Sequence, residues 1–129
     1  MNSKQAVDSP HVAPVFGYYS TAVLKNNMMF LSGHGPFDEN QQLVGAGDFA
    51  AQVDKTMQNI RHVLEDNGFE MDDIVRSTVY LNDIANWSVF NEIYGRYFTA
   101  PYPARCVVAC ELNGFDIEIE CTAIRDERE

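Results

Sequence analysis

Residues 103–125 read P-A-R-C-V-V-A-C-E-L-N-G-F-D-I-E-I-E-C-T-A-I-R, with one strand-like segment on each side of Asn113-Gly114. The first segment, residues 105–112, is apolar on both faces. The second segment, residues 116–124, alternates between apolar and acidic side chains, the period of a half-buried strand. Asn-Gly between two such runs is a strong hairpin signal, because both residues tolerate a positive φ angle. We therefore expect these segments to pair as a β-hairpin.

The expected hairpin would bring a guanidinium and a carboxylate onto neighbouring strands. Arg105 begins the first strand, and Glu118 and Glu120 share one face of the second. A guanidinium beside a carboxylate, both on rigid strands, can hold a small acid and help to hydrolyse it. The same two groups can also form an ordinary surface ion pair. On these residues alone, the ion pair is the simpler interpretation.

Length and charge limit the class of protein. A chain of 129 residues is the size of one domain with its own core, so we expect a single domain over residues 1–129. Residues 1 to about 15 are expected to be irregular because Pro10 and Pro14 interrupt any regular element. The formal net charge of −10, from 9 Lys and Arg against 19 Asp and Glu, repels phosphate backbones. A nucleic-acid partner is therefore disfavoured.

The sequence also favours a cytoplasmic protein without a membrane partner. Its first ten residues lack the apolar centre of a signal peptide or anchor, and no apolar run approaches membrane-spanning length. The cysteines are odd in number and fall on expected strands: Cys106, Cys110 and Cys121. Such cysteines are typical of free thiols in a reducing compartment.

The order of the elements predicts an α+β fold. We expect strands at residues 18–24, 28–32 and 74–81, in addition to the two of the hairpin, and helices at residues 49–67 and 84–98. Asp48 is the expected N-cap of the first helix, with Gln52 on its polar face. The order β-β-α-β-α-β-β places both helices on one face of a sheet. Because residues 28–31 and 106–110 are apolar on both sides, we expect another chain to cover the second face.

Four segments in the same order resemble the RidA family, also called YjgF, from about residue 10 onward. They are G-Y-Y-S-T-A at residues 17–22, M-M-F-L-S-G-H-G-P at 28–36, F-N-E-I-Y-G-R-Y-F at 90–98, and P-A-R followed by E-I-E near the end. The resemblance implies a chorismate-mutase-like fold and a homotrimer with clefts between subunits. It also implies hydrolysis of imines or enamines without a cofactor.

The resemblance also implies roles for individual residues. The arginine that Arg105 matches holds the substrate carboxylate, and the first acid of E-I-E, here Glu118, orients the hydrolytic water. The matching residues that line the cleft are Tyr19, Ser32, Gly33 and Asn91.

Two positions depart from the family pattern and bear on substrate choice. His34 stands where the family often has glutamine, and Val107 where it often has cysteine. Cys106 comes one residue early, and because side chains alternate along a strand it should face away from Arg105. We expect no metal site, because the three histidines are scattered along the chain and Cys106 and Cys110 do not form a C-x-x-C pair.

The sequence therefore favours an imine or enamine deaminase that converts small 2-imino or 2-enamino acids to 2-oxo acids and ammonia. Its expected partners are a small carboxylate substrate and two further copies of the chain. The alternative is a module that binds 2-oxo acids, or acts like a chaperone, without turnover. An endoribonuclease is a third interpretation, which the net charge of −10 disfavours.

Overall fold

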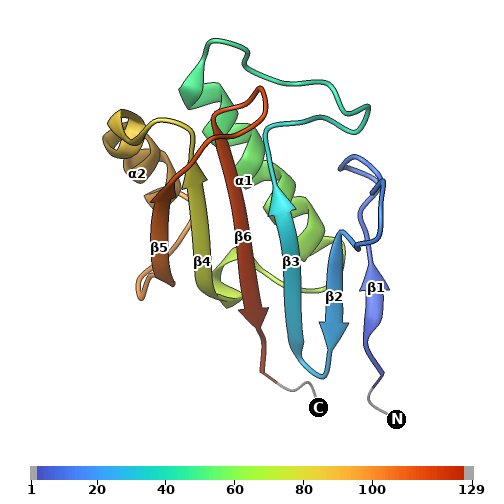
Figure 1. Cartoon of the computed structure of the whole chain (residues 1–129). Helices are drawn as coiled ribbons and strands as arrows, with labels where there is room; N and C mark the ends of the chain where they lie inside the picture. Colours follow the sequence, from blue (N-terminus) through green and yellow to red (C-terminus); the bar gives the residue numbers. More distant parts are fainter. Residues whose placement is uncertain (1–2, 127–129) are drawn as a thin grey trace.

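Six strands form one mixed sheet in the order β1-β2-β3-β6-β4-β5, and both helices pack against the same face of it (Figure 1). The structure is a computed structural model, and it describes residues 3–126. The strands are β1 (Gln5–Val7), β2 (Ala22–Lys25), β3 (Met28–His34), β4 (Ile74–Leu81), β5 (Ala104–Ala109) and β6 (Ile117–Ile124). The α-helices are α1 (Phe49–Glu65) and α2 (Trp87–Gly95), and the 3₁₀ helices are Met71–Asp73 and Ile84–Asn86. The predicted α+β class with both helices on one face is confirmed.

The expected hairpin of residues 105–112 with residues 116–124 is wrong. β4 lies between β5 and β6, pairing parallel with β5 and antiparallel with β6. The segment with Asn113-Gly114 crosses the end of β4 instead of making a tight turn. Asn82, which follows β4, holds this crossing: its side-chain oxygen accepts from the Leu112 N–H at 2.9 Å, and its own N–H donates to the Asp116 carbonyl at 3.1 Å.

The position of β6 in the middle of the sheet follows from its alternating pattern. One face carries Ile117, Ile119, Cys121 and Ala123, all at most 5% exposed beneath the helices. Burial of such a face is worth about 25 cal/mol per Å² of apolar surface. A central place between β3 and β4 buries this face completely, whereas β5 is left at the edge.

Helix α1 begins where the sequence predicts, but a residue expected on its polar face is buried. The Asp48 side chain accepts from the Ala51 N–H at 3.1 Å, the expected N-cap bond. Gln52, expected on the polar face, is only 2% exposed. Its amide nitrogen donates to the Gly45 carbonyl at 3.0 Å, and its oxygen accepts from the Asp116 N–H at 2.8 Å. These hydrogen bonds satisfy the buried amide and tie two loops to the helix.

Several boundaries differ from those predicted. The segment expected to be irregular contains β1, which pairs with β2 through the register of Gln5 with Leu24. The strand expected from residue 18 begins at Ala22, and the helix expected over residues 84–98 is a 3₁₀ turn followed by the shorter α2. β3 continues past Ser32 to His34, because a register shift between Leu31 and His34 lets the strand accommodate Gly33.

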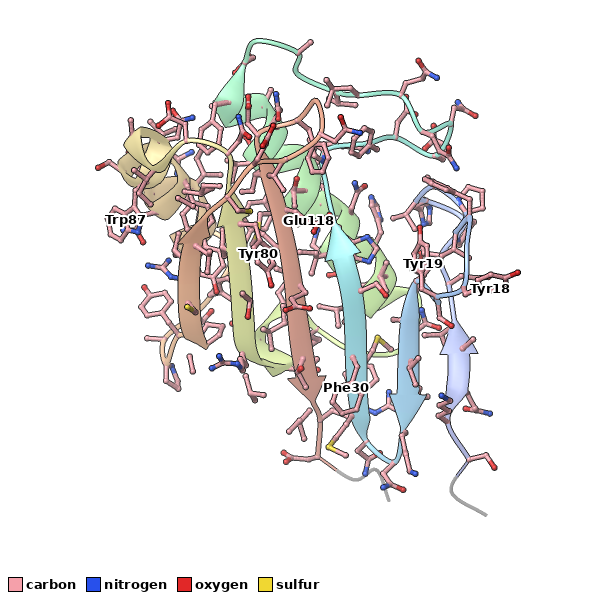
Figure 2. All side chains as sticks on the ribbon, viewed as in Figure 1. Tyr18, Tyr19, Phe30, Tyr80, Trp87 and Glu118 are labelled. Atoms are coloured by element: carbon pink, nitrogen blue, oxygen red, sulfur yellow. The ribbon has the colours of Figure 1, made fainter. Side chains whose placement is uncertain are left out.

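The sheet face away from the helices is exposed in the single chain. Its strands place Phe30, Val108 and Ile124 there, with exposed fractions of 43%, 37% and 44%. Figure 2 shows Phe30, Tyr80 and Glu118 along this face. The expectation that another chain covers this face stays a prediction. Among residues 3–126, no helix is both long and apolar enough to cross a membrane.

Candidate functional site

A cavity of about 320 Å³ opens at the end of β3 and holds four of the sequence-predicted site residues. Its walls come from the N-terminal loop, from the segment after β3 and from β6. The predicted residues that line it are Tyr19, Ser32, Gly33 and Glu118. We call it the Glu118 cavity.

Glu118 and Gly33 lie in direct contact across β6 and β3. A Cβ atom added at Gly33 would stand 2.8 Å from Glu118 Cδ, a separation that real Cβ atoms do not reach. Glycine at this position therefore leaves room for the carboxylate. Partial burial raises the pKa of Glu118 above the ordinary value of a glutamate, and the nearby Glu120 carboxylate raises it further. A carboxylate with a raised pKa is suited to accept a proton near neutral pH.

Ser32 and Tyr19 supply hydroxyl groups to the same cavity. The Ser32 hydroxyl donates to the Ser20 carbonyl, so that its oxygen lone pairs stay free to accept a further hydrogen bond. The Ser32 N–H donates to the Thr21 carbonyl at 3.1 Å, which fixes this part of β3 against the N-terminal loop. Tyr19 is 49% exposed and lies on the loop side of the opening.

Two buried polar side chains also line the cavity wall: His34, which the sequence marked only as a departure from the family pattern, and Asn59, which it did not identify. Burial lowers the pKa of His34 to about 4, so its imidazole is neutral at physiological pH. Its Nε2 atom and the Asn59 Oδ1 atom are both buried, and neither has a hydrogen-bond partner within residues 3–126. The Asn59 amide nitrogen donates to the Gly35 and Phe37 carbonyls at 2.9 and 2.8 Å. The only sequence signal for Asn59 was that it is a polar residue next to Ile60, on the apolar side of α1.

Arg105 lies in a different place, between β5 and α2. Its guanidinium donates to Asn91 Oδ1 at 2.9 Å and stands 5.0 to 5.7 Å from the ring centres of three aromatic residues on α2. These residues are Trp87, Phe90 and Tyr94. We call this group, with Asn91, the Arg105 cradle. Cation–π contacts and the amide hold the planar fork in one orientation.

Strand register separates the two groups within one chain. β4 aligns Ser77 with Arg105 on one side and Tyr80 with Glu118 on the other. Two strand spacings and the three-residue offset from Ser77 to Tyr80 place the two backbones roughly 14 Å apart, at ~4.8 Å per strand and ~3.3 Å per residue. Arg105 also shares the helix-covered face with Ser77, whereas Glu118 faces the exposed side with Tyr80. The expected meeting of Arg105 with Glu118 on adjacent strands is therefore wrong for a single chain.

Figure 2 gives the same division at the scale of the whole molecule. Trp87, beside Arg105, lies at one edge of the sheet, and Tyr18 and Tyr19 lie toward the other. Asn91 was expected beside Tyr19 and Ser32, but it belongs to the Arg105 cradle.

The cysteines and histidines give one confirmed expectation and one correction. Cys106 faces away from Arg105, as the alternation predicts, and all three cysteines are free. Burial raises the pKa of the Cys121 thiol to about 12, which makes it an inert core residue. The histidines are not all scattered in space: the rings of His11 and His62 stack with their centres 4.5 Å apart.

The chain is similar to known proteins over nearly its whole length. A model of the protein family described as Endoribonuclease L-PSP matches residues 10–125. The chloroplastic Reactive Intermediate Deaminase A of Arabidopsis thaliana is 36% identical over 124 residues, which cover 93% of this chain and 65% of that protein. The protein named 3-aminoacrylate deaminase RutC from Acinetobacter baylyi is 33% identical over 115 residues, 89% of this chain and 88% of that protein.

A solved structure agrees with the sequence comparison. The crystal structure of the YjgF gene product from E. coli matches with a TM-score of 0.87 and 28% identity. The match covers 95% of this chain and 99% of that one. The chain is therefore similar in sequence to two proteins named as deaminases and similar in fold to the YjgF gene product.

Proposed function

This chain belongs to the Endoribonuclease L-PSP family, and from that premise we propose that it is a deaminase for small 2-imino or 2-enamino acids. The products are the 2-oxo acid and ammonia. The reaction needs water, a group that accepts its proton and a group that holds the substrate carboxylate. The observation that carries the proposal is the Glu118 carboxylate, whose pKa is raised, on the wall of a cavity large enough for a small acid.

Glu118 is the proton acceptor in this scheme. Water held by the carboxylate attacks the C=N carbon as Glu118 takes one of its protons, and Glu118 returns that proton to the nitrogen, which gives a neutral carbinolamine. Glu118 then takes the carbinol O–H proton and passes it to the same nitrogen, so that the C–N bond breaks, the C=O bond forms and ammonia leaves. Such positioned acid–base assistance contributes typically ~10²–10⁴-fold. The Ser32 and Tyr19 hydroxyls are placed to bind the water or the substrate nitrogen.

Arg105 binds the substrate carboxylate in this scheme. Its planar fork can donate two parallel hydrogen bonds to a carboxylate, which a lysine cannot match. The cradle of Asn91 and three rings supports this role, because it holds the fork without an acidic partner that would compete with the substrate. Within residues 3–126, Arg105 forms no salt bridge.

The complete site is assembled between subunits of a homotrimer, in which Arg105 of one chain faces the Glu118 cavity of the next. The separation of the two groups within one chain supports this step. Exposed apolar side chains beside both groups support it. Beside the cavity Phe16 is 69% and Tyr18 fully exposed, and near Arg105 Tyr102 is 61% and Trp87 40% exposed. Such clustered apolar exposure is typical of an interface.

Ammonia release tests the activity. A dehydratase generates iminopyruvate or iminobutyrate in the assay, and release of ammonia is followed with and without this protein. We expect faster release than in buffer, and an unchanged rate would contradict the proposal for these substrates. Sedimentation equilibrium tests the assembly: we expect three times the chain mass, and a species of 14.6 kDa would contradict the trimer.

A binding module without turnover is the second candidate, and the observation in its favour is the neutral His34 in the cavity. Equilibrium dialysis against 2-oxo acids distinguishes the two. Binding together with accelerated ammonia release supports the deaminase, whereas binding without any release supports the module. The family description names an endoribonuclease, but the net charge of −10 disfavours an RNA substrate.

A further inference from the structure

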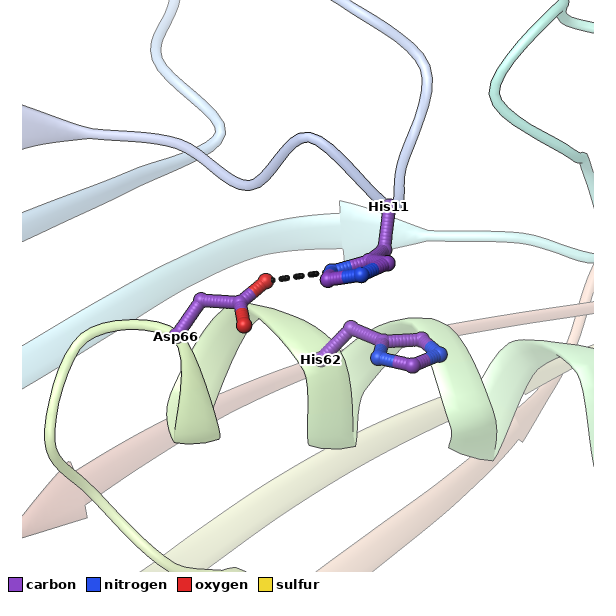
Figure 3. Close-up of side chains that lie close together, drawn as sticks. All are labelled: His11, His62 and Asp66. Atoms are coloured by element: carbon purple, nitrogen blue, oxygen red, sulfur yellow. Dashed lines mark hydrogen bonds and ion pairs between the residues drawn. The ribbon is translucent and has the colours of Figure 1, made fainter.

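A second cluster of chemically active side chains lies on the helix side of the sheet, away from Arg105 and Glu118. It consists of His11, His62 and Asp66 (Figure 3). His11 Nδ1 and Asp66 Oδ2 are 2.7 Å apart, and the two imidazole rings stack with an interplanar angle of 20°. One candidate ligand atom from each residue lies within 4.8 Å of the other two. The cluster combines two imidazoles and one carboxylate at the protein surface.

The backbone positions of the three residues, and not only their side-chain contacts, bring these groups together. His62 and Asp66 are separated by four residues at the C-terminal end of α1, so they project from the same side of the helix. His11 comes from the N-terminal segment, which is fastened to the same helix end. The Ser9 hydroxyl donates to Asp66, and the Asn67 amide donates to the Asp8 carbonyl at 3.0 Å.

Two further contacts fix the position of His11. Its own N–H donates to the Ser9 hydroxyl oxygen at 3.1 Å, and the next residue, Val12, is buried in the core with 6% exposure. The backbone of His11 is therefore anchored on both sides. Its side chain, by contrast, is 53% exposed and can turn about its bonds.

We propose that His11, His62 and Asp66 form a binding site for one divalent transition-metal ion, with zinc as the reference ion. Two imidazole nitrogens and one carboxylate oxygen are a ligand set that zinc accepts, with the fourth position left to water. Ligands ~2.0–2.1 Å from a tetrahedral ion lie about 3.3 Å from one another. The three ligand atoms converge to that spacing by small rotations of surface side chains, and the ion replaces the hydrogen bond between His11 and Asp66.

The site has a structural consequence for the Glu118 cavity. Residues from Val12 to Tyr19 continue directly from His11, and several of them line that cavity: Val12, Ala13, Pro14, Val15, Phe16 and Tyr19. A bound ion clamps the start of this wall to α1. The proposal does not depend on the deaminase activity, because the three ligands touch neither Arg105 nor Glu118.

Calorimetric titration of the untagged full-length protein with zinc chloride tests the proposal. We expect one ion per chain and a dissociation constant in the micromolar range or tighter. His62→Ala and Asp66→Asn should each weaken binding at least ~10–100-fold, since removal of even an outer-shell partner commonly costs that much. Glu65→Gln is the matched control, because this neighbouring carboxylate lies outside the cluster, and its affinity should equal that of the wild type.

Two further measurements separate binding from a change of fold. Thermal unfolding in the presence of a chelator should give similar midpoints for the wild type and for His62→Ala. Addition of zinc should raise the midpoint of the wild type only, by mass action. Cobalt substitution should give the visible absorption of a four-coordinate ion in the wild type and not in His62→Ala. Millimolar zinc affinity, or an affinity unchanged in both variants, would overturn the site and leave the cluster as a hydrogen-bonded fastening of the N-terminal segment.

Discussion

The Glu118 cavity and the Arg105 cradle each hold one charged group, but they hold it in opposite ways. Glu118 sits against the backbone of Gly33, and its partial burial raises its pKa. Arg105 is held by an amide oxygen and three aromatic rings. Within residues 3–126, the acid has no cationic partner and the guanidinium has no anionic one.

In the proposed function, each region is half of a site. A charge kept without a counter-charge costs stability unless a ligand or another chain supplies the partner. A substrate with a carboxylate at one end and a C=N group at the other needs both halves. Because the two groups are separated within one chain, the proposed catalysis requires the assembly of at least two chains.

Glu118→Gln should have the largest effect on the proposed activity. The amide keeps the size of the side chain against Gly33 but cannot accept the proton of the attacking water. We expect kcat to fall by ~10²–10⁴-fold. Steady-state ammonia release measures it. Glu120→Gln is the matched control on the same strand face and should stay within ~2-fold at neutral pH; an equal loss in both variants would assign the effect to charge rather than to Glu118.

Arg105→Lys comes next and tests the cradle. Lysine keeps the charge but loses the bidentate fork, so kcat/KM should fall by at least ~10²-fold, about 3 kcal/mol of transition-state binding. The assembled mass should be unchanged in sedimentation. Near-wild-type activity would remove Arg105 from the substrate site and with it most of the case for a carboxylate substrate.

Asn91→Ala should have a smaller effect, because Asn91 acts on the substrate through Arg105. Loss of one hydrogen bond leaves the three rings in place, and we expect kcat/KM to fall ~10-fold, mainly through a higher KM. Glu92→Gln on the same helix is the control, since its carboxylate bonds Arg96 and not Arg105. A fall confined to kcat would contradict a positioning role in carboxylate binding.

The pH dependence gives the smallest and most specific effect. Glu118 must be ionised to accept a proton, and its pKa is raised, so kcat/KM should fall as the pH drops through a value above that of an ordinary glutamate. Glu120 contributes to this rise. In Glu120→Gln the acidic limb of the profile should therefore move to lower pH, while Glu65→Gln leaves it in place. A shift to higher pH would contradict the assigned interaction.

The parts of the fold that periodicity determines agree with the sequence. Ile74–Leu81 is the strand predicted at residues 74–81, and the alternation of β6 places its apolar side chains under the helices. The predicted hairpin is wrong because Asn113-Gly114 is only a local signal. The pairing of β5 and β6 is decided by β4, which lies between them in the sheet and more than 20 residues earlier in the chain. Asn82 and Gln52 then bind the crossing segment, and no spacing rule identifies such contacts.

The candidate site shows the same limit. Tyr19, Ser32, Gly33 and Glu118 lie around one cavity, as the resemblance implies. The resemblance does not say which residues belong to which half, and Arg105 and Asn91 proved to form a group of their own. Asn59 was missed because its place on the cavity wall depends on the path of the loop at Gly35 and Phe37.

Subunit mixing tests the central claim most directly. Arg105→Lys and Glu118→Gln chains, each nearly inactive alone, are co-refolded in equal amounts, and mass spectrometry verifies that mixed oligomers form. If Arg105 and Glu118 of different chains make one site, about one quarter of the interfaces in a random mixture carry both wild-type residues, because each subunit interface draws its two sides independently. We predict recovery of about a quarter of the wild-type activity. Activity that stays at the level of the separate variants in proven mixed oligomers would contradict a site shared between subunits.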